Sequence, residues 1–133
     1  MSRCVIISAC PVSASLASAL RPGDTIIACD AGYRNCEPLH CRPDIIVGDF
    51  DTAPCPAQEG GDTIILPHVK DDTDTEYAAK LASEKGFDEA LLLGALGGRR
   101  LEHTLANLCT GFGLEQRGVR ATLLDERKIG RAS

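Results

Sequence analysis

Six short apolar runs, spaced along the chain, constrain its fold more than any other feature of the sequence. Each run is four to six residues long and rich in Ile, Leu, Val or Ala. Such runs are typical of strands buried on both faces of a sheet. They are Cys4–Ala9, Thr25–Cys29, Asp44–Val47, Thr63–Leu66, Ala90–Leu93 and Ala121–Leu124.

Helix patterns occupy several of the connections between these runs. Pro11 and Ser13 open a short helix, and Thr73 with Glu76 forms a capping box for a second one. A third helix carries one apolar stripe, made of Leu101, Leu105, Leu108 and Phe112. Parallel neighbours need crossover connections, so this alternation predicts an α/β fold. We expect a three-layer, open, mostly parallel six-stranded sheet with helices on both faces, which is a Rossmann-like architecture.

Length and composition narrow the class of protein further. With 133 residues the chain has room for one domain, which we place at residues 1–126, followed by a tail at 127–133. The net charge of -5 has the wrong sign for non-specific nucleic-acid binding. No apolar run approaches the roughly 20 residues that span a bilayer, so we expect no membrane partner. The seven cysteines include no CxxC pair and are expected to be free thiols in a reducing cytoplasm.

Polar segments follow four of the predicted strands. They are Asp30–Gly32, Gly48–Thr52, Lys70–Asp74 and Gly94–Arg100. Open parallel sheets bind their ligands outside the carboxyl ends of the strands. We therefore expect these four segments to converge on one edge of the sheet.

Acidic residues dominate the second and third of these segments. Asp49 and Asp51 are two residues apart, so in an extended segment their carboxylates point the same way. Two carboxylates ~5 Å apart at an effective dielectric of ~20 repel by roughly 3 kcal/mol. With Asp71 and Asp74 nearby, the cluster suits a hard cation such as Mg²⁺, which commonly bridges carboxylates to phosphates. The alternative is that these aspartates only cap turns and the start of a helix.

The fourth segment suits phosphate. Gly97 and Gly98 offer accessible backbone N–H groups, and Arg99 and Arg100 offer guanidinium groups directly before a helix. The glycines also fit a simple turn. His103 and Asn107 lie four residues apart, on the flank of the helix away from the leucine stripe. A pair at that spacing is usually a solvated helix face, but here it follows directly on the loop.

Taken in order, these motifs resemble the thiamine pyrophosphokinase family. The resemblance rests on Gly48–Thr52, on Asp71–Asp74, and on Gly97–Arg99 followed by Leu101–Asn107. Asp30-Ala31-Gly32 resembles the family's turn after the second strand less closely. The likeness spans most of the chain, from about Thr25 to Glu126.

The resemblance implies an activity and a set of site residues. The family transfers pyrophosphate from ATP to thiamine, giving thiamine diphosphate and AMP, with Mg²⁺ required. Carried over, Mg²⁺ and catalysis would fall to Asp49, Asp51, Asp71 and Asp74. ATP would be bound by Asp30, Gly32, Thr73, Gly97, Gly98, Arg99, Arg100, His103 and Asn107. The resemblance also implies a homodimer.

The sequence departs from the family pattern in three ways. An extra residue between Gly98 and His103 leaves open whether Arg99 or Arg100 fills the family's arginine position. Glu102 stands where the family usually has Asp. Family members continue into a β-rich domain that helps to form the thiamine pocket, so residues 127–133 are expected to be a tail or a truncated linker to that domain.

Two other functions fit some of the same residues. The chain could be a catalytically incomplete nucleotide-binding module. A phosphatase of the haloacid dehalogenase type also places a DxD motif after a strand, but its motif follows the first strand and wants Thr or Val where Ala53 stands.

Overall fold

The computed structural model describes residues 2–8, 10, 12–47, 64–66, 74–95, 101–124 and 129–131. Among these residues the strands are β1 (Arg3–Ile7), β2 (Thr25–Cys29), β3 (Ile45–Val47), β4 (Ile64–Leu66), β5 (Glu89–Leu93), β6 (Arg120–Leu124) and β7 (Ile129–Arg131). The helices are two 3-10 helices, η1 (Ala14–Ala19) and η2 (Asp30–Cys36), and two α-helices, α1 (Asp74–Glu84) and α2 (Leu101–Gln116).

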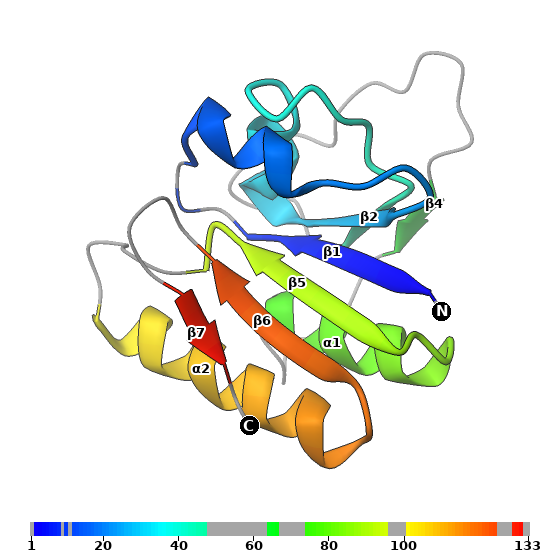
Figure 1. The fold of residues 1–133 in the computed structure, drawn as a ribbon. Coiled ribbons are helices and arrows are strands. Elements are labelled where there is room, and N and C mark those ends of the chain that lie inside the picture. The colour runs from blue at the N-terminus through cyan, green and yellow to red at the C-terminus, as the bar shows by residue number, and fades with distance from the viewer. Residues whose placement is uncertain are drawn as a thin grey trace.

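All seven strands form one sheet in the order β4-β3-β2-β1-β5-β6-β7 (Figure 1). The first six strands are parallel, and β7 runs antiparallel to β6. The chain builds outward from β1 to β4 on one side and then crosses back to β5 on the other. The order of the strands therefore reverses between β1 and β5, where ligand crevices form in sheets of this kind.

Two hydrophobic cores, one on each face of the sheet, explain the unbroken apolar runs. In β1, Cys4 and Ile6 point into one core, and Val5 and Ile7 into the other. All four side chains are fully buried. A strand covered on both faces needs apolar residues at every position, as the sequence predicted.

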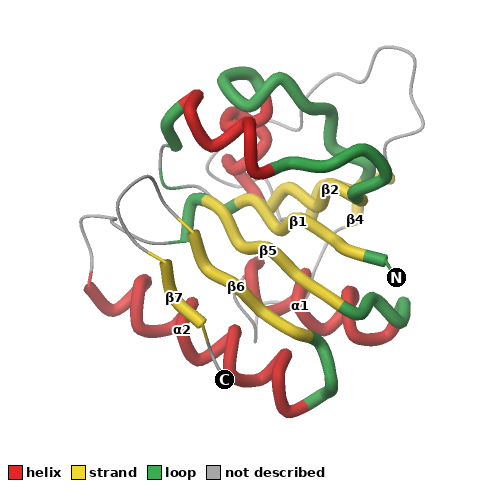
Figure 2. The backbone as a smooth tube through the Cα atoms, in the orientation of Figure 1, coloured by secondary structure: helices red, strands yellow, loops and turns green. Residues whose placement is uncertain are grey.

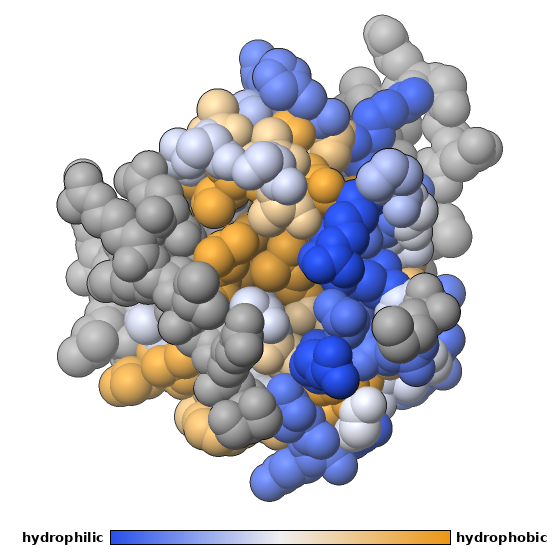
Figure 3. All heavy atoms as spheres, in the orientation of Figure 1, coloured by the Kyte–Doolittle hydropathy of each residue, from blue (hydrophilic) through white to orange (hydrophobic). Residues whose placement is uncertain are grey.

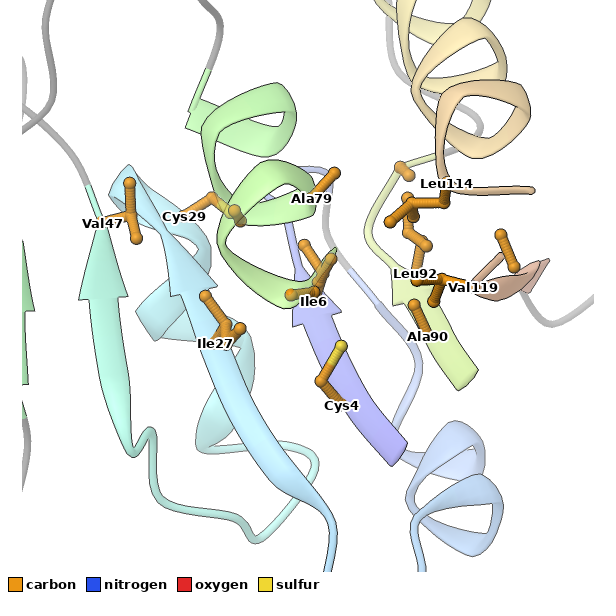
Figure 4. Close-up of a cluster of buried hydrophobic side chains, with 14 of the residues drawn as sticks. Cys4, Ile6, Ile27, Cys29, Val47, Ala79, Ala90, Leu92, Leu114 and Val119 are labelled. Atoms are coloured by element: carbon orange, nitrogen blue, oxygen red, sulfur yellow. The ribbon is translucent and has the colours of Figure 1, made fainter. Parts of the chain in front are cut away.

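The first core lies between the sheet and the two α-helices. Figure 4 shows Ile6 and Ile27 beneath α1, and Leu114 of α2 above Leu92. The residues that α1 buries against the sheet are the small side chains of Ala78, Ala79 and Ala82.

The second face is covered differently, by η1, η2 and the segments around them (Figure 2). Leu16 of η1 and the residues Cys36 and Leu39 at and beyond the end of η2 fill this core. The expected three-layer, Rossmann-like arrangement is therefore not confirmed, because α-helices among the described residues cover one face alone. Both short helices are 3-10 helices, of six and seven residues.

The strand count needs correction too. The six predicted strands are present, but β7 adds a seventh inside residues 127–133, where the sequence predicted a tail. A search for apolar runs does not find Ile129–Arg131, because this edge strand is short and its sequence has one apolar residue followed by Gly130 and Arg131.

Candidate functional site

The carboxyl edge of the sheet is where the candidate site must be sought. Since β2, β3, β4 and β5 run parallel in one sheet, their carboxyl ends all lie at this same edge. The predicted convergence of strand ends is confirmed to this extent.

Most of the predicted site side chains lie outside the described part of the structure. Those wholly outside it are Asp49, Asp51, Asp71, Thr73, Gly97, Gly98, Arg99 and Arg100. Asp30, Asp74 and His103 are described by their backbone alone, at or near the starts of η2, α1 and α2. Their roles stay predictions.

The start of α1 is attached to the end of β1. The hydroxyl groups of Ser8, which follows β1, and Thr75, the second residue of α1, lie 2.7 Å apart. Both side chains are buried. This hydrogen bond places the amino end of α1, and with it the backbone of Asp74, at the carboxyl edge.

Asn35 holds the chain that follows β1. Its Nδ2 donates one hydrogen bond to the Ser8 carbonyl oxygen at 2.8 Å and another to the Cys10 carbonyl oxygen at 2.9 Å. The side chain is buried at the end of η2. No sequence pattern points to Asn35, Ser8 or Thr75, because short polar residues are common in ordinary turns.

Two glycines allow the backbone to pack tightly here. Gly94, with φ +69°, follows β5, and a Cβ atom there would collide with the carbonyl oxygens of Ser8 and Cys10. The Gly94 carbonyl accepts from the Cys10 amide at 3.0 Å, so the chains after β1 and β5 stay paired. A Cβ atom at Gly32 would collide with the Ile7 carbonyl oxygen. The structural need for Gly32 is thus close packing against β1.

Asn107 connects α2 to the end of β5. Its Nδ2 donates to the Ala95 carbonyl oxygen at 3.0 Å, and its side chain is half-buried. The interpretation of His103 and Asn107 as a solvated helix face is therefore wrong for Asn107, which anchors the helix beside the predicted phosphate segment.

The structure also contains a cavity of about 700 Å³ that lies beside η1 and along β5 and β6. Its lining extends from Glu89 and Arg120, at the amino ends of β5 and β6, to Leu124 at the carboxyl end of β6. Figure 3 shows this side of the molecule, with hydrophobic residues beside a hydrophilic border. Ligands of open parallel sheets bind beyond the carboxyl ends of the strands and not along a face of the sheet, so we do not assign the candidate site to this cavity.

Two further observations concern the described residues alone. None of their helices is long and apolar enough to cross a membrane. Their side chains form no cluster of three or more His, Cys, Asp or Glu that would hold a metal ion.

The sheet order defines an α/β domain of the mostly parallel-sheet class, in which the candidate site is expected at the carboxyl edge, near the point where strand order reverses. Residues 16–123 match the family model described as "Thiamin pyrophosphokinase, catalytic domain". The chain therefore belongs to the thiamin pyrophosphokinase family. Among curated protein sequences none is significantly similar to it.

Solved structures agree with this fold. Thiamine pyrophosphokinase from Bacillus subtilis superposes with a TM-score of 0.78 at 22% identity, over 94% of this chain and 61% of its own. The enzyme from Geobacillus thermodenitrificans gives 0.75 at 26% identity, over 92% of this chain and 59% of its own. That from Candida albicans gives 0.68 at 16% identity, over 91% and 57%. The chain thus spans about three fifths of the length of these proteins.

Proposed function

We propose that this chain binds Mg·ATP at the carboxyl edge of its sheet and serves the transfer of pyrophosphate from ATP to thiamine. Family membership supports the class of reaction. The observation that carries the assignment to this edge is the parallel pairing of β2, β3, β4 and β5, from whose ends the acidic and glycine-rich segments follow.

In this proposal the metal is held by Asp49, Asp51, Asp71 and Asp74. Their donor set fits Mg²⁺, which prefers carboxylate oxygens and keeps room for phosphate oxygens in its coordination shell. The ion would neutralise charge that develops on the phosphates during transfer.

The nucleotide would be bound by residues from three of the strand ends. They are Asp30, Gly32, Thr73, Gly97, Gly98, Arg99, Arg100, His103 and Asn107. Backbone N–H groups and guanidinium groups before α2 suit phosphate oxygens. The hydrogen bond from Asn107 to Ala95 supports this by holding α2 beside the segment that contains the glycines and arginines.

The proposed reaction forms one bond and breaks one. The thiamine hydroxyl oxygen attacks the β-phosphorus of ATP. The bond from the β-phosphorus to the oxygen that bridges it to the α-phosphorus breaks, and AMP leaves with that oxygen. A carboxylate, Asp71 or Asp74, accepts the hydroxyl proton. We expect this chain to bind Mg·ATP at these residues.

The test is a calorimetric titration of the chain with Mg·ATP, followed by incubation with thiamine. Asp49→Asn and Asp51→Asn should each weaken binding by tenfold or more and leave the unfolding midpoint nearly unchanged. Glu84→Gln is the matched control, since it removes one negative charge at the exposed carboxyl end of α1.

Three outcomes decide between the candidate functions. AMP together with thiamine diphosphate supports the transferase, and nucleotide binding without product supports the incomplete module. Release of phosphate from simple monoesters supports the phosphatase. If both Asp variants bind Mg·ATP like the parent, the metal assignment is wrong. Sedimentation of the same sample tests the homodimer that the family resemblance implies.

A further inference from the structure

Three buried polar side chains, Ser8, Asn35 and Thr75, surround the end of β1. Their exposed fractions are 5%, 7% and 6%, which lie within the range of the buried apolar residues. They come from three segments: the chain after β1, the helix η2 and the first turn of α1. None of the three belongs to the set of residues proposed above to touch metal or nucleotide.

Their hydrogen bonds join those three segments. The amide nitrogen of Asn35 donates to two carbonyl oxygens of the chain after β1, those of Ser8 and Cys10. The hydroxyl of Ser8 in turn binds the hydroxyl of Thr75. The backbone of residue 8 is thus held from η2 while its side chain holds α1.

Stability alone does not account for such an arrangement. A buried pair of hydroxyl groups adds little net free energy, and replacing both partners with apolar groups of the same shape is often nearly neutral. Hydrogen bonds of this kind instead fix the relative position of two elements, because they set the distance and angle at which the elements meet.

The elements joined in this way carry two of the proposed ligands. Asp30 is the first residue of η2, five positions before Asn35, and Asp74 directly precedes Thr75 in α1. The hydrogen bonds of Asn35 and Thr75 therefore set where the backbones of both aspartates lie relative to the end of β1.

We propose that Ser8, Asn35 and Thr75 are positioning residues, which hold η2 and α1 against the end of β1 in the arrangement that binds Mg·ATP. The proposal rests on the function proposed above. Groups that orient metal ligands typically contribute 10- to 100-fold to affinity without touching the ligand.

Paired variants at Thr75 separate positioning from stability. Thr75→Val keeps the shape of the side chain and removes the hydroxyl, whereas Thr75→Ser keeps the hydroxyl and removes a methyl group. We expect Thr75→Val to raise the Kd of Mg·ATP, measured by calorimetry, by tenfold or more. Thr75→Ser should bind within about threefold of the parent even where its unfolding midpoint falls.

A second pair of variants controls for folding. Asn35→Ala should weaken Mg·ATP binding as Thr75→Val does, because the Ser8 and Cys10 carbonyl groups lose their shared donor. Leu16→Val destabilises the second core, which η1 and η2 cover, but removes none of these hydrogen bonds, and should leave the Kd of Mg·ATP unchanged.

Amide hydrogen exchange without nucleotide distinguishes the two proposals. Exchange in the second turn of α1, where the backbone N–H groups first have intrahelical acceptors, should rise in Thr75→Val and stay low in Thr75→Ser and Leu16→Val. If the parent does not bind Mg·ATP, the proposed function fails, and with it any role of these residues in binding. If the parent and Thr75→Val bind equally, or exchange in α1 is unchanged, the positioning role is overturned while the proposed function stands.

Discussion

Arg3 and Asp24 form an ion pair at the amino ends of β1 and β2. The Arg3 Nε donates to Asp24 Oδ1 at 2.9 Å, and an Arg3 Nη2 group also donates to the Ala19 carbonyl oxygen at 2.8 Å. Burial raises the pKa of Asp24, but hydrogen bonds from Arg3 and the Arg21 amide, with the charge of Arg3, outweigh burial. The pKa of this carboxyl group therefore lies below its ordinary value.

A lowered pKa predicts how stability depends on pH. Folding favours the charged form of Asp24, so its contribution is present above the unfolded pKa of about 3.9 and is lost as pH falls through the lower folded value. We expect Asp24→Asn to cost about 2 kcal/mol at pH 7, because it leaves Arg3 without its carboxylate.

The measurement is urea unfolding of the parent and Asp24→Asn between pH 7 and pH 2. The difference between their free energies of unfolding should shrink at the acid end of this range. A difference that stays constant across it would show that the ion pair does not set the stability of this edge.

Single residues differ in how readily their roles can be predicted from sequence. Gly94 was expected to lie in a loop after a strand, and its φ of +69° agrees with that. Asn35 and Thr75 gave no signal, because their partners are up to 67 residues away in the chain. Such pairings depend on the sheet topology, which a local pattern does not contain.

For the helix α2, the sequence pattern predicted the element but not the face that it buries. Its existence and its end near Gly118 were predicted, but Leu105 and Phe112 of the predicted apolar stripe are 53% and 54% exposed. The helix instead buries Leu114 and Thr110. The hydrogen bonds that α2 makes to β5 and α1 set its rotation, and helical periodicity alone cannot choose between two partly apolar faces.

One of these contacts predicts a coupling between the two α-helices. The buried Thr110 hydroxyl donates to Glu76 Oε2 at 2.8 Å. In a double-mutant cycle, Thr110→Val and Glu76→Ala should show a coupling free energy of about 1 to 2 kcal/mol in urea unfolding, as expected for a hydrogen bond to a charged group. Strictly additive effects would mean that this bond does not hold α1 to α2.

At the scale of the whole molecule, β1 lies at the centre of the sheet, and this position determines how deeply its side chains are buried. It is paired on both sides, with β2 and β5, and its Cys4 side chain is fully buried. Burial raises the pKa of the Cys4 thiol to about 12. Cys109 on α2 is exposed by comparison.

This contrast predicts which thiols report global unfolding. N-ethylmaleimide should label Cys109 at once, whereas labelling of Cys4 should occur only at the rate of global unfolding and should accelerate with urea. Peptide mass spectrometry measures both. Labelling of Cys4 in the native protein at the rate of Cys109 would contradict the buried position of β1.

The same thiol affects stability in alkali. The unfolded chain loses the Cys4 proton near pH 8.5, whereas the folded chain keeps it to about pH 12. Stability from this group is therefore present below pH ~8.5 and falls above it, by up to ~1.4 kcal/mol per pH unit. In alkaline urea unfolding, Cys4→Ala should show a smaller fall than the parent in the free energy of unfolding, because the raised pKa of Cys36 still contributes.

The sequence by itself determined the α/β class, the six parallel strands and the segments that follow each one. These features are local, since a strand buried on both faces must be apolar throughout and a helix must show its own period. Tertiary structure alone decided the seventh strand, the face that α2 buries and the hydrogen bonds that join Ser8, Asn35 and Thr75. Each of these depends on groups brought together from distant parts of the chain, and the free energy of such contacts exists only once the sheet has formed.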